Sequence, residues 1–341
     1  MKYSFKSDYC ELAHPEVLKA LINVGNKQFD GYGLDEYSLR AAEMIKKKIN
    51  APDADVHFIS GGTHANLTVI SSILRPYEAV IAPDNGHIFV HEAGAIEATG
   101  HKICTAPGVN GKLEATDIEE ILITHDDEHM VSPKLVYISQ TTETGTVYTK
   151  SQLQEISKIC RKHNLILFID GARLNVAMNS YVNDLSYADI TNLVDVFYIG
   201  GTKNGALYGE AIVITNEAIK KDFRIILKQR GALLSKGAAI AIQFEALLKD
   251  DLMDKIAKHA NSMATKMAKG ITDAGYELLS PVESNMLLPI FPDIIVDKLR
   301  EEYEFYDWKK TNGKTTVRLL TSWATPERII DEFITYLKSV G

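Results

Sequence analysis

The chain contains little cysteine and no long apolar run. Its three cysteines, Cys10, Cys104 and Cys160, are scattered among 341 residues, and no Cys-x-x-Cys pair occurs. So few thiols indicate neither a disulfide framework nor a zinc site. No apolar stretch approaches the ~20 residues that a membrane-spanning helix needs. The first residues also lack the apolar core of a signal peptide. We therefore expect a cytoplasmic protein with no membrane partner.

Positive charge is also too sparse to indicate a nucleic-acid partner. The 37 lysines and arginines are outnumbered by 45 acidic residues, which gives a formal net charge of −8, and no basic stripe stands out. His125 and His129 bracket three acidic residues, but this spacing fixes no ligand geometry, so no metal site is predicted. Hydrophobic and charged contents of 45% and 24% are ordinary for a globular chain.

Two short apolar runs end abruptly at polar residues. Residues 165–169 precede Asp170, and residues 196–199 lead to Lys203. Such runs are typical of strands buried on both faces of a parallel sheet, and ligands bind beyond the carboxyl ends of those strands. Taken alone, Asp170 could be a loop cap and Lys203 a solvated surface lysine. Together they favour pyridoxal phosphate (PLP), which needs a lysine for a Schiff base and an acid for its pyridinium nitrogen.

Two other predicted strands are followed by candidate cofactor residues. Residues 56–59 run into Ser60-Gly61-Gly62-Thr63 and then into a helical pattern. Free amides at such a helix start bind anions, so Gly62 and Thr63 are candidate phosphate donors, although ordinary βα turns look similar. His87 follows the predicted strand 79–82 and could stack on a flat ring, or be structural. A helix is predicted over residues 90–98.

The C-terminal part of the chain changes character. Long helical patterns begin near residue 218, and short strands and helices follow from residue 286. We predict an N-terminal arm and large domain over residues 1–245 and a small α+β domain over residues 246–341. Arg318 interrupts an apolar strand. It could bind a substrate carboxylate bidentately, or lie on the solvent face of an alternating strand.

These segments together resemble the threonine aldolase family, within the β-eliminating lyase group of fold type I PLP enzymes. The resemblance runs from Lys6-Ser7-Asp8 to Val317-Arg318-Leu319, and its most specific part is Asp170-Gly171-Ala172-Arg173 followed by Thr202-Lys203. It implies an α/β large domain of the PLP-dependent transferase-like kind, with a mainly parallel sheet, plus a smaller α+β domain. It also implies a homotetramer built from dimers.

The resemblance assigns a role to each candidate residue. Lys203 would hold PLP, Asp170 would pair with its pyridine nitrogen, and His87 would stack on its ring. Gly62 and Thr63 would bind the phosphate. The residues implied for the substrate carboxylate are Ser7, Arg173 and Arg318, and Arg173 is also implied as a cofactor-binding residue. Arg230 or Lys236 could reach the phosphate site of a neighbouring subunit. The implied reaction cleaves L-threonine, L-allo-threonine or a related β-hydroxy amino acid to glycine and an aldehyde.

One departure from the family pattern concerns the base. The family usually has a histidine, proposed to act on the substrate's β-hydroxyl, in the loop that follows Ser139. This chain has Thr141-Thr142-Glu143 there, with Thr142 taken as the replacement. His91 or a bound water could substitute. Other PLP chemistry, such as β-elimination or transamination, or PLP binding without aldolase activity, therefore stays open.

Overall fold

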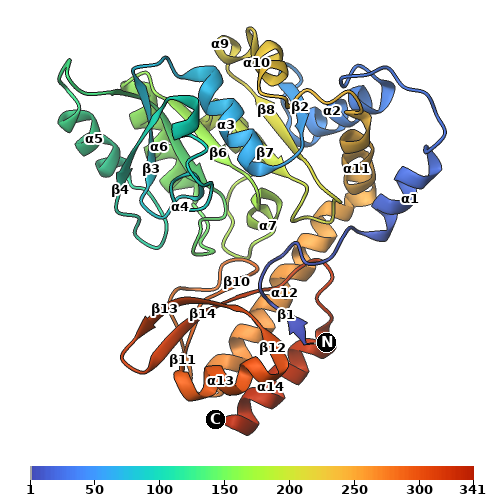
Figure 1. Ribbon diagram of the computed structural model, residues 1–341, viewed down its shortest axis with the longest axis vertical. Coiled ribbons are helices and arrows are strands. Elements are labelled where there is room, and N and C mark those ends of the chain that lie inside the picture. Colours follow the sequence, from blue (N-terminus) through green and yellow to red (C-terminus); the bar gives the residue numbers. More distant parts are fainter. Residues whose placement is uncertain (1) are drawn as a thin grey trace.

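Seven strands form the central sheet of the structure, a computed structural model that describes residues 2–341 (Figure 1). Among these seven strands β8 alone runs opposite to the other six, which confirms the predicted, mainly parallel sheet. The strand order is β2 (Asp55–Ile59), β8 (Glu210–Ile214), β7 (Val196–Gly200), β6 (Ile166–Asp170), β5 (Ser132–Ser139), β3 (Glu78–Pro83) and β4 (Lys102–Ala106).

Helices cover both faces of this sheet because its strands are apolar on both sides. Val80 and Ile81, for example, are both fully buried but belong to different apolar clusters. One face packs against α1 (Pro15–Asn23), α2 (Glu36–Ile49), α5 (Ala115–Thr124), α6 (Lys150–Lys162), α7 (Leu174–Met178), α8 (Tyr187–Leu193) and α11 (Ala238–Leu248). The other packs against α3 (Gly62–Ile73), α4 (His87–Val90), α9 (Glu217–Lys220) and α10 (Phe223–Gln229).

The prediction of a helix over residues 90–98 is wrong. Helix α4 ends at Val90, and only a 3₁₀ turn, η1 (Glu97–Thr99), forms within the predicted range. Ala93 and Gly94 both have positive φ angles, of 51° and 75°. A left-handed backbone cannot continue a right-handed helix, so the segment turns instead.

A smaller domain lies below the large one in Figure 1. Its sheet contains β9 (Glu277–Leu278), β10 (Met286–Leu287), β11 (Pro289–Pro292), β13 (Tyr306–Thr311) and β14 (Lys314–Leu320). Helices α12 (Leu252–Asp273), α13 (Asp293–Glu302) and α14 (Glu327–Val340) pack with it around Phe291 and Phe333. The N-terminal arm joins this core through Phe5, and its strand β1 (Tyr3–Ser4) pairs with β12 (Tyr303–Glu304).

The long helix α12 connects the two domains (Figure 1). A 3₁₀ turn, η2 (Lys249–Asp251), separates it from α11. The predicted division after residue 245 falls inside α11, and Leu247, Met253 and Ile256 pack in the large domain's core. Across residues 2–341, no helix is both long and apolar enough to cross a membrane.

Candidate active site

A cavity of about 520 Å³ opens at the carboxyl ends of the parallel strands. The turns after β2, β3, β5, β6 and β7 all contribute to its wall, and β14 of the small domain contributes Arg318. This is where an open α/β sheet is expected to bind ligands. The cavity brings together seven predicted site residues: Gly62, Thr63, His87, Asp170, Arg173, Lys203 and Arg318.

Lys203 lies in a tightly bonded turn after β7. The carboxylate of Glu210, at the start of β8, accepts hydrogen bonds from the Gly201 amide at 2.7 Å and the Thr202 hydroxyl at 2.8 Å. A Cβ atom at position 201 would meet the Gly209 carbonyl at 2.5 Å, so the turn requires glycine there. Desolvation in the cavity and the charge of Arg173 lower the pKa of Lys203 below its ordinary value. The amine is therefore more easily neutral, as a nucleophile must be.

Four donors hold the carboxylate of Asp170. Oδ2 accepts from the Tyr137 hydroxyl at 2.6 Å and from Asn66 Nδ2 at 3.1 Å, and Oδ1 accepts from the Tyr198 hydroxyl and from the Ala172 amide at 3.0 Å. Burial by itself would raise the pKa of Asp170, but His87 and these donors lower it below the ordinary value. Asp170 is therefore an ionised acid in a fixed orientation.

The ring of His87 is oriented by a buried acid. Its Nδ1 lies 2.7 Å from Oε1 of Glu92, which also accepts a hydrogen bond from Asn66 at 2.7 Å. Desolvation opposes the charge on His87, yet the bond to Glu92 and the charges of Glu143 and Asp170 raise its pKa. Asn66 also donates to Asp170, so its amide group contacts both Asp170 and the Glu92 carboxylate that orients His87.

The turn after β2 presents free amides. Helix α3 starts at Gly62 after the cap residue Gly61, and no side chain caps its first turn. Those N–H groups and the helix dipole favour an anion. A Cβ atom at position 62 would lie 3.1 Å from the Tyr198 hydroxyl, so a side chain there would crowd the cavity wall.

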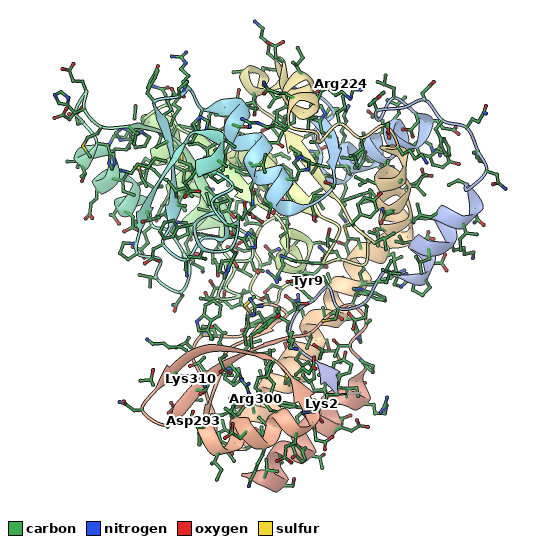
Figure 2. The ribbon with its side chains drawn as sticks, viewed as in Figure 1. Lys2, Tyr9, Arg224, Asp293, Arg300 and Lys310 are labelled. Carbon is green, nitrogen blue, oxygen red and sulfur yellow. The ribbon has the colours of Figure 1, made fainter. Side chains whose placement is uncertain are left out.

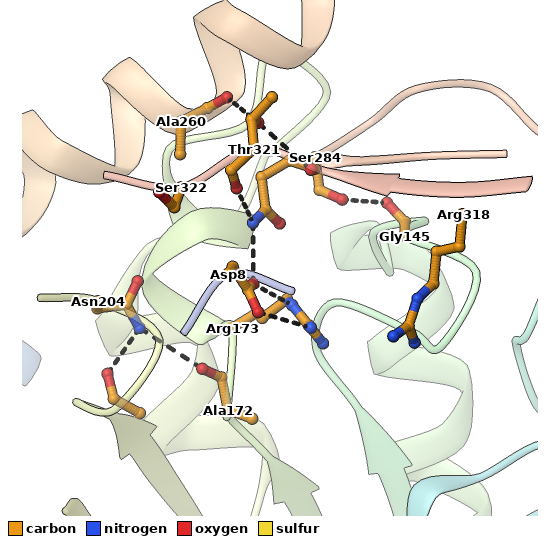
Figure 3. A network of polar contacts seen from close by, with 12 residues as sticks. Asp8, Gly145, Ala172, Arg173, Asn204, Ala260, Ser284, Arg318, Thr321 and Ser322 are labelled. Atoms are coloured by element: carbon orange, nitrogen blue, oxygen red, sulfur yellow. Dashed lines mark hydrogen bonds and ion pairs between the residues drawn. The ribbon is translucent and has the colours of Figure 1, made fainter. Parts of the chain in front are cut away.

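The two predicted carboxylate-binding arginines differ in their pairing (Figure 3). Arg173 donates from Nε and Nη2 to Asp8 of the arm, at 2.6 and 3.0 Å, and Asn285 donates to the same carboxylate at 2.9 Å. Arg318 forms no ion pair within residues 2–341; its Nη2 contacts the Lys6 carbonyl at 3.3 Å, and its buried Nε has no hydrogen-bond partner. Of the two arginines, Arg318 is thus the one without an anion among residues 2–341.

Other predicted residues lie outside the cavity wall. The Ser7 hydroxyl lies 3.3 Å from the Cys10 thiol and does not line the cavity. Arg230 donates to Ser71 of its own chain at 3.1 Å, and Lys236 is exposed. Thr142 does not line the cavity either, because its hydroxyl is hydrogen-bonded to that of Thr146 at 2.8 Å.

Several residues that support the site were not predicted to act there: Asp8, Asn66, Glu92, Tyr137, Tyr198 and Glu210. Each acts through a tertiary contact that its local sequence does not show. The one usable signal was position: Tyr198 lies in β7 and Glu210 begins β8, the two strands joined by the turn that carries Lys203.

Comparison with known proteins agrees with this geometry. The family model described as β-eliminating lyase matches residues 5–291. The low specificity L-threonine aldolase of a Pseudomonas species is 33% identical over 342 residues, covering 98% of this chain and 97% of that protein. Its counterpart from Pseudomonas aeruginosa is 32% identical, covering 94% of this chain and 93% of that protein.

Solved structures give the same result. A threonine aldolase from Leishmania major superposes with a TM-score of 0.98 at 48% identity, covering 99% of each chain. An aspartate aminotransferase from Thermus thermophilus, at 15% identity and a TM-score of 0.73, covers 100% of this chain and 92% of its own, and shares the fold alone. This chain belongs to the threonine aldolase family of β-eliminating lyases.

Proposed function

We propose that this protein is a PLP-dependent aldehyde-lyase that cleaves L-threonine, L-allo-threonine or a related β-hydroxy amino acid to glycine and an aldehyde. The observation that carries the proposal is the convergence of Lys203, Asp170 and Arg318 in one cavity, where Arg318 makes no ion pair within residues 2–341. An amine, an ionised acid and a free cation are what an amino-acid lyase of this kind needs. The Pseudomonas and Leishmania major proteins named above are threonine aldolases, and this chain matches each of them over nearly its whole length.

The residues of the cavity fit pyridoxal 5'-phosphate. Lys203 would hold it as a Schiff base, His87 would stack on its ring, and the amides of Gly62 and Thr63 would bind its phosphate. Asp170 would keep a proton on the pyridine nitrogen, for which an ionised carboxylate is required. When bound, the cofactor supplies an electron sink for the pair left on Cα after bond cleavage.

Arg318 supplies the site for the substrate carboxylate. Its planar guanidinium can donate two parallel hydrogen bonds and so fix the substrate's orientation. Arg173 lines the same cavity, but Asp8 already accepts from two of its nitrogens, so we assign it to the cofactor side and to shaping the carboxylate site. Ser7 would contribute only if the arm moved, because its side chain does not line the cavity.

A visible absorption spectrum of the purified protein tests the proposal. We expect a band from the Lys203-bound cofactor that changes when threonine or glycine is added, and release of aldehyde and glycine from threonine. Lys203→Ala should lose both the band and turnover. A Lys203→Ala protein with full activity would contradict the assignment of the lysine.

A second candidate function is β-elimination or transamination on the same site. The Thr141-Thr142-Glu143 loop, which lacks a histidine, is the observation that favours it. A keto acid in place of an aldehyde would identify this chemistry. Cofactor binding without any turnover would instead indicate a relative that has lost aldolase activity.

We also propose a homo-oligomer, built from dimers into a tetramer. Large apolar side chains are exposed beside the cavity: Tyr9 is 55% exposed, Phe89 47% and Val90 48%. Figure 2 places Tyr9 at the junction of the two domains. Arg230 or Lys236 reaching a neighbour's phosphate site and a cytoplasmic location remain predictions from the sequence.

A further inference from the structure

Among residues 2–341, Glu143 is the one acid of the cavity wall without a partner. It is 9% exposed and lines the cavity, yet within residues 2–341 its carboxylate makes neither a hydrogen bond nor an ion pair. The other two acids of the wall are satisfied, Asp170 by four donors and Glu210 by two. Its carboxylate oxygens are therefore free to accept a hydrogen bond from a ligand in the cavity.

The loop that carries Glu143 is firmly held. The Thr146 hydroxyl donates to the Asn110 carbonyl at 2.7 Å, and Ser284 of the small domain donates to the Gly145 carbonyl at 2.7 Å. Thr142 is bonded inside the same loop by its amide and its hydroxyl. Glu143 is therefore presented to the cavity by a rigid segment, and its free carboxylate is not a consequence of a loose loop.

The charges around Glu143 define what it would accept. Lys203, Arg173 and Arg318 line the same cavity, as do His87 and His91. The negative charge of Glu143 acts to raise the pKa of Lys203 and of Arg318, which line the same cavity. A substrate carboxylate would be drawn to Arg318 and repelled by Glu143. A hydroxyl group, which can donate a hydrogen bond, suits Glu143 instead.

We propose that Glu143 accepts the proton of the substrate's β-hydroxyl group during Cα–Cβ cleavage. The inference rests on the proposed function and names the base for it. The O–H bond breaks and its proton moves to a carboxylate oxygen of Glu143. The freed electron pair forms the second C–O bond of the aldehyde, the Cα–Cβ bond breaks, and its pair remains on the Cα side until a proton is added there.

His91 is the competing group. It also lines the cavity, on the segment after α4, and its ring centroid lies 5.5 Å from that of His87. Unlike Glu143, it is exposed. Its pKa is lowered by desolvation, which the charge of Glu143 opposes. Comparing His91→Asn with a Glu143 variant separates the two assignments.

The test compares wild type with Glu143→Gln, which keeps the side chain's shape but removes its basic oxygen pair. Two reactions are followed on the cofactor-loaded protein: aldehyde release from threonine, and exchange of a glycine α-proton with D₂O. We expect cleavage to fall on the order of 10²–10⁴-fold, the usual contribution of a general base. Glycine has no hydroxyl group, so its exchange should change little. Glu155→Gln, at an exposed position on α6, is the matched control.

A third readout needs no substrate. Removing the charge of Glu143 should lower the pH midpoint of the absorbance change of the resting, cofactor-loaded protein, because a nearby anion stabilises the protonated nitrogen of Lys203. Glu155→Gln should leave this midpoint in place. An unmoved midpoint in Glu143→Gln would contradict the placement of Glu143 beside Lys203.

The outcomes are distinguishable. If Glu143→Gln retains cleavage, the assignment of Glu143 as the base is overturned, but the proposed function is not. Loss of glycine exchange in parallel with cleavage would also overturn it, because Glu143 would then serve the site generally. A larger loss in His91→Asn than in Glu143→Gln would move the role to His91. A wild-type protein that releases no aldehyde from any β-hydroxy amino acid would overturn the proposed function, and this inference with it.

Discussion

At the scale of single residues, the charge of Asp170 is the feature that the proposed chemistry depends on most. The neighbouring histidine and four donors keep this buried carboxyl ionised. Asp170→Asn preserves the shape but removes the charge that would hold a proton on the pyridine nitrogen. Each tenfold loss in rate corresponds to about 1.4 kcal/mol of activation barrier. We expect the variant to weaken this ion pair by a few kcal/mol, so kcat should fall about 10²-fold or more.

The control for Asp170→Asn is a comparison of its folding with that of the wild type. Circular dichroism and thermal unfolding should remain close to wild type, because asparagine can still bond to Tyr137 and Ala172. Unchanged turnover in a folded, cofactor-loaded variant would contradict the role of Asp170.

The Asp8–Arg173 pair makes a residue-scale prediction about stability. Both side chains are buried, and Asp8 also accepts a bond from Asn285 of the small domain. Removing one partner of a buried pair leaves an uncompensated charge, so Asp8→Ala should lower the free energy of unfolding by about 3–5 kcal/mol. Glu119→Ala breaks the exposed pair with Lys162 and should cost only about 0–1 kcal/mol. Equal losses in urea unfolding would contradict this contrast.

At the scale of elements, the sequence predicted the strands well and the supporting contacts poorly. Residues 165–169 and 196–199 are apolar at every position, and only strands buried on both faces need that pattern. Arg318 was left open between a carboxylate site and a solvent face, because alternation along β14 does not reveal that its Nε is buried without a partner. The Asp8–Arg173 contact joins residues 165 positions apart, which no local pattern encodes.

The turn between β7 and β8 gives a prediction on pH dependence. Burial raises the pKa of Glu210 to about 7 from an ordinary 4.5, although Thr202 and Gly201 donate to it. A carboxyl group with a raised pKa in the folded state contributes stability below its unfolded pKa and loses it as the pH rises through the folded one. Glu210→Gln should therefore gain stability relative to wild type between pH 4.5 and about 7, by up to about 3 kcal/mol.

Urea unfolding of the cofactor-free protein between pH 5 and pH 8 measures this effect. Glu155→Gln, which removes an exposed acid, should follow the wild-type curve. A Glu210→Gln curve parallel to wild type across the whole range would show that Glu210 does not titrate there.

At the scale of the whole molecule, the N-terminal arm contacts both domains, and both domains contribute residues to the cavity. Phe5 packs in the small domain's core, while Asp8, three residues later, binds Arg173 of the large domain and Asn285 of the small one (Figure 3). Arg318 reaches the cavity from β14 of the small domain. The position of the carboxylate site relative to Lys203 is therefore set by how the two domains and the arm pack.

The exposed apolar residues beside the cavity carry the last prediction, which concerns assembly. Burying a phenylalanine side chain is worth about 1.5–3 kcal/mol, so Tyr9, Phe89 and Val90 favour a contact that removes them from water. We expect sedimentation to give a species larger than the 37.9 kDa chain. Phe89→Glu should weaken association, because a charge would then be buried at the contact. Ile123→Glu, at a 77% exposed position on α5, should not. A wild-type monomer, or equal effects of the two variants, would show that these residues do not form the contact between subunits.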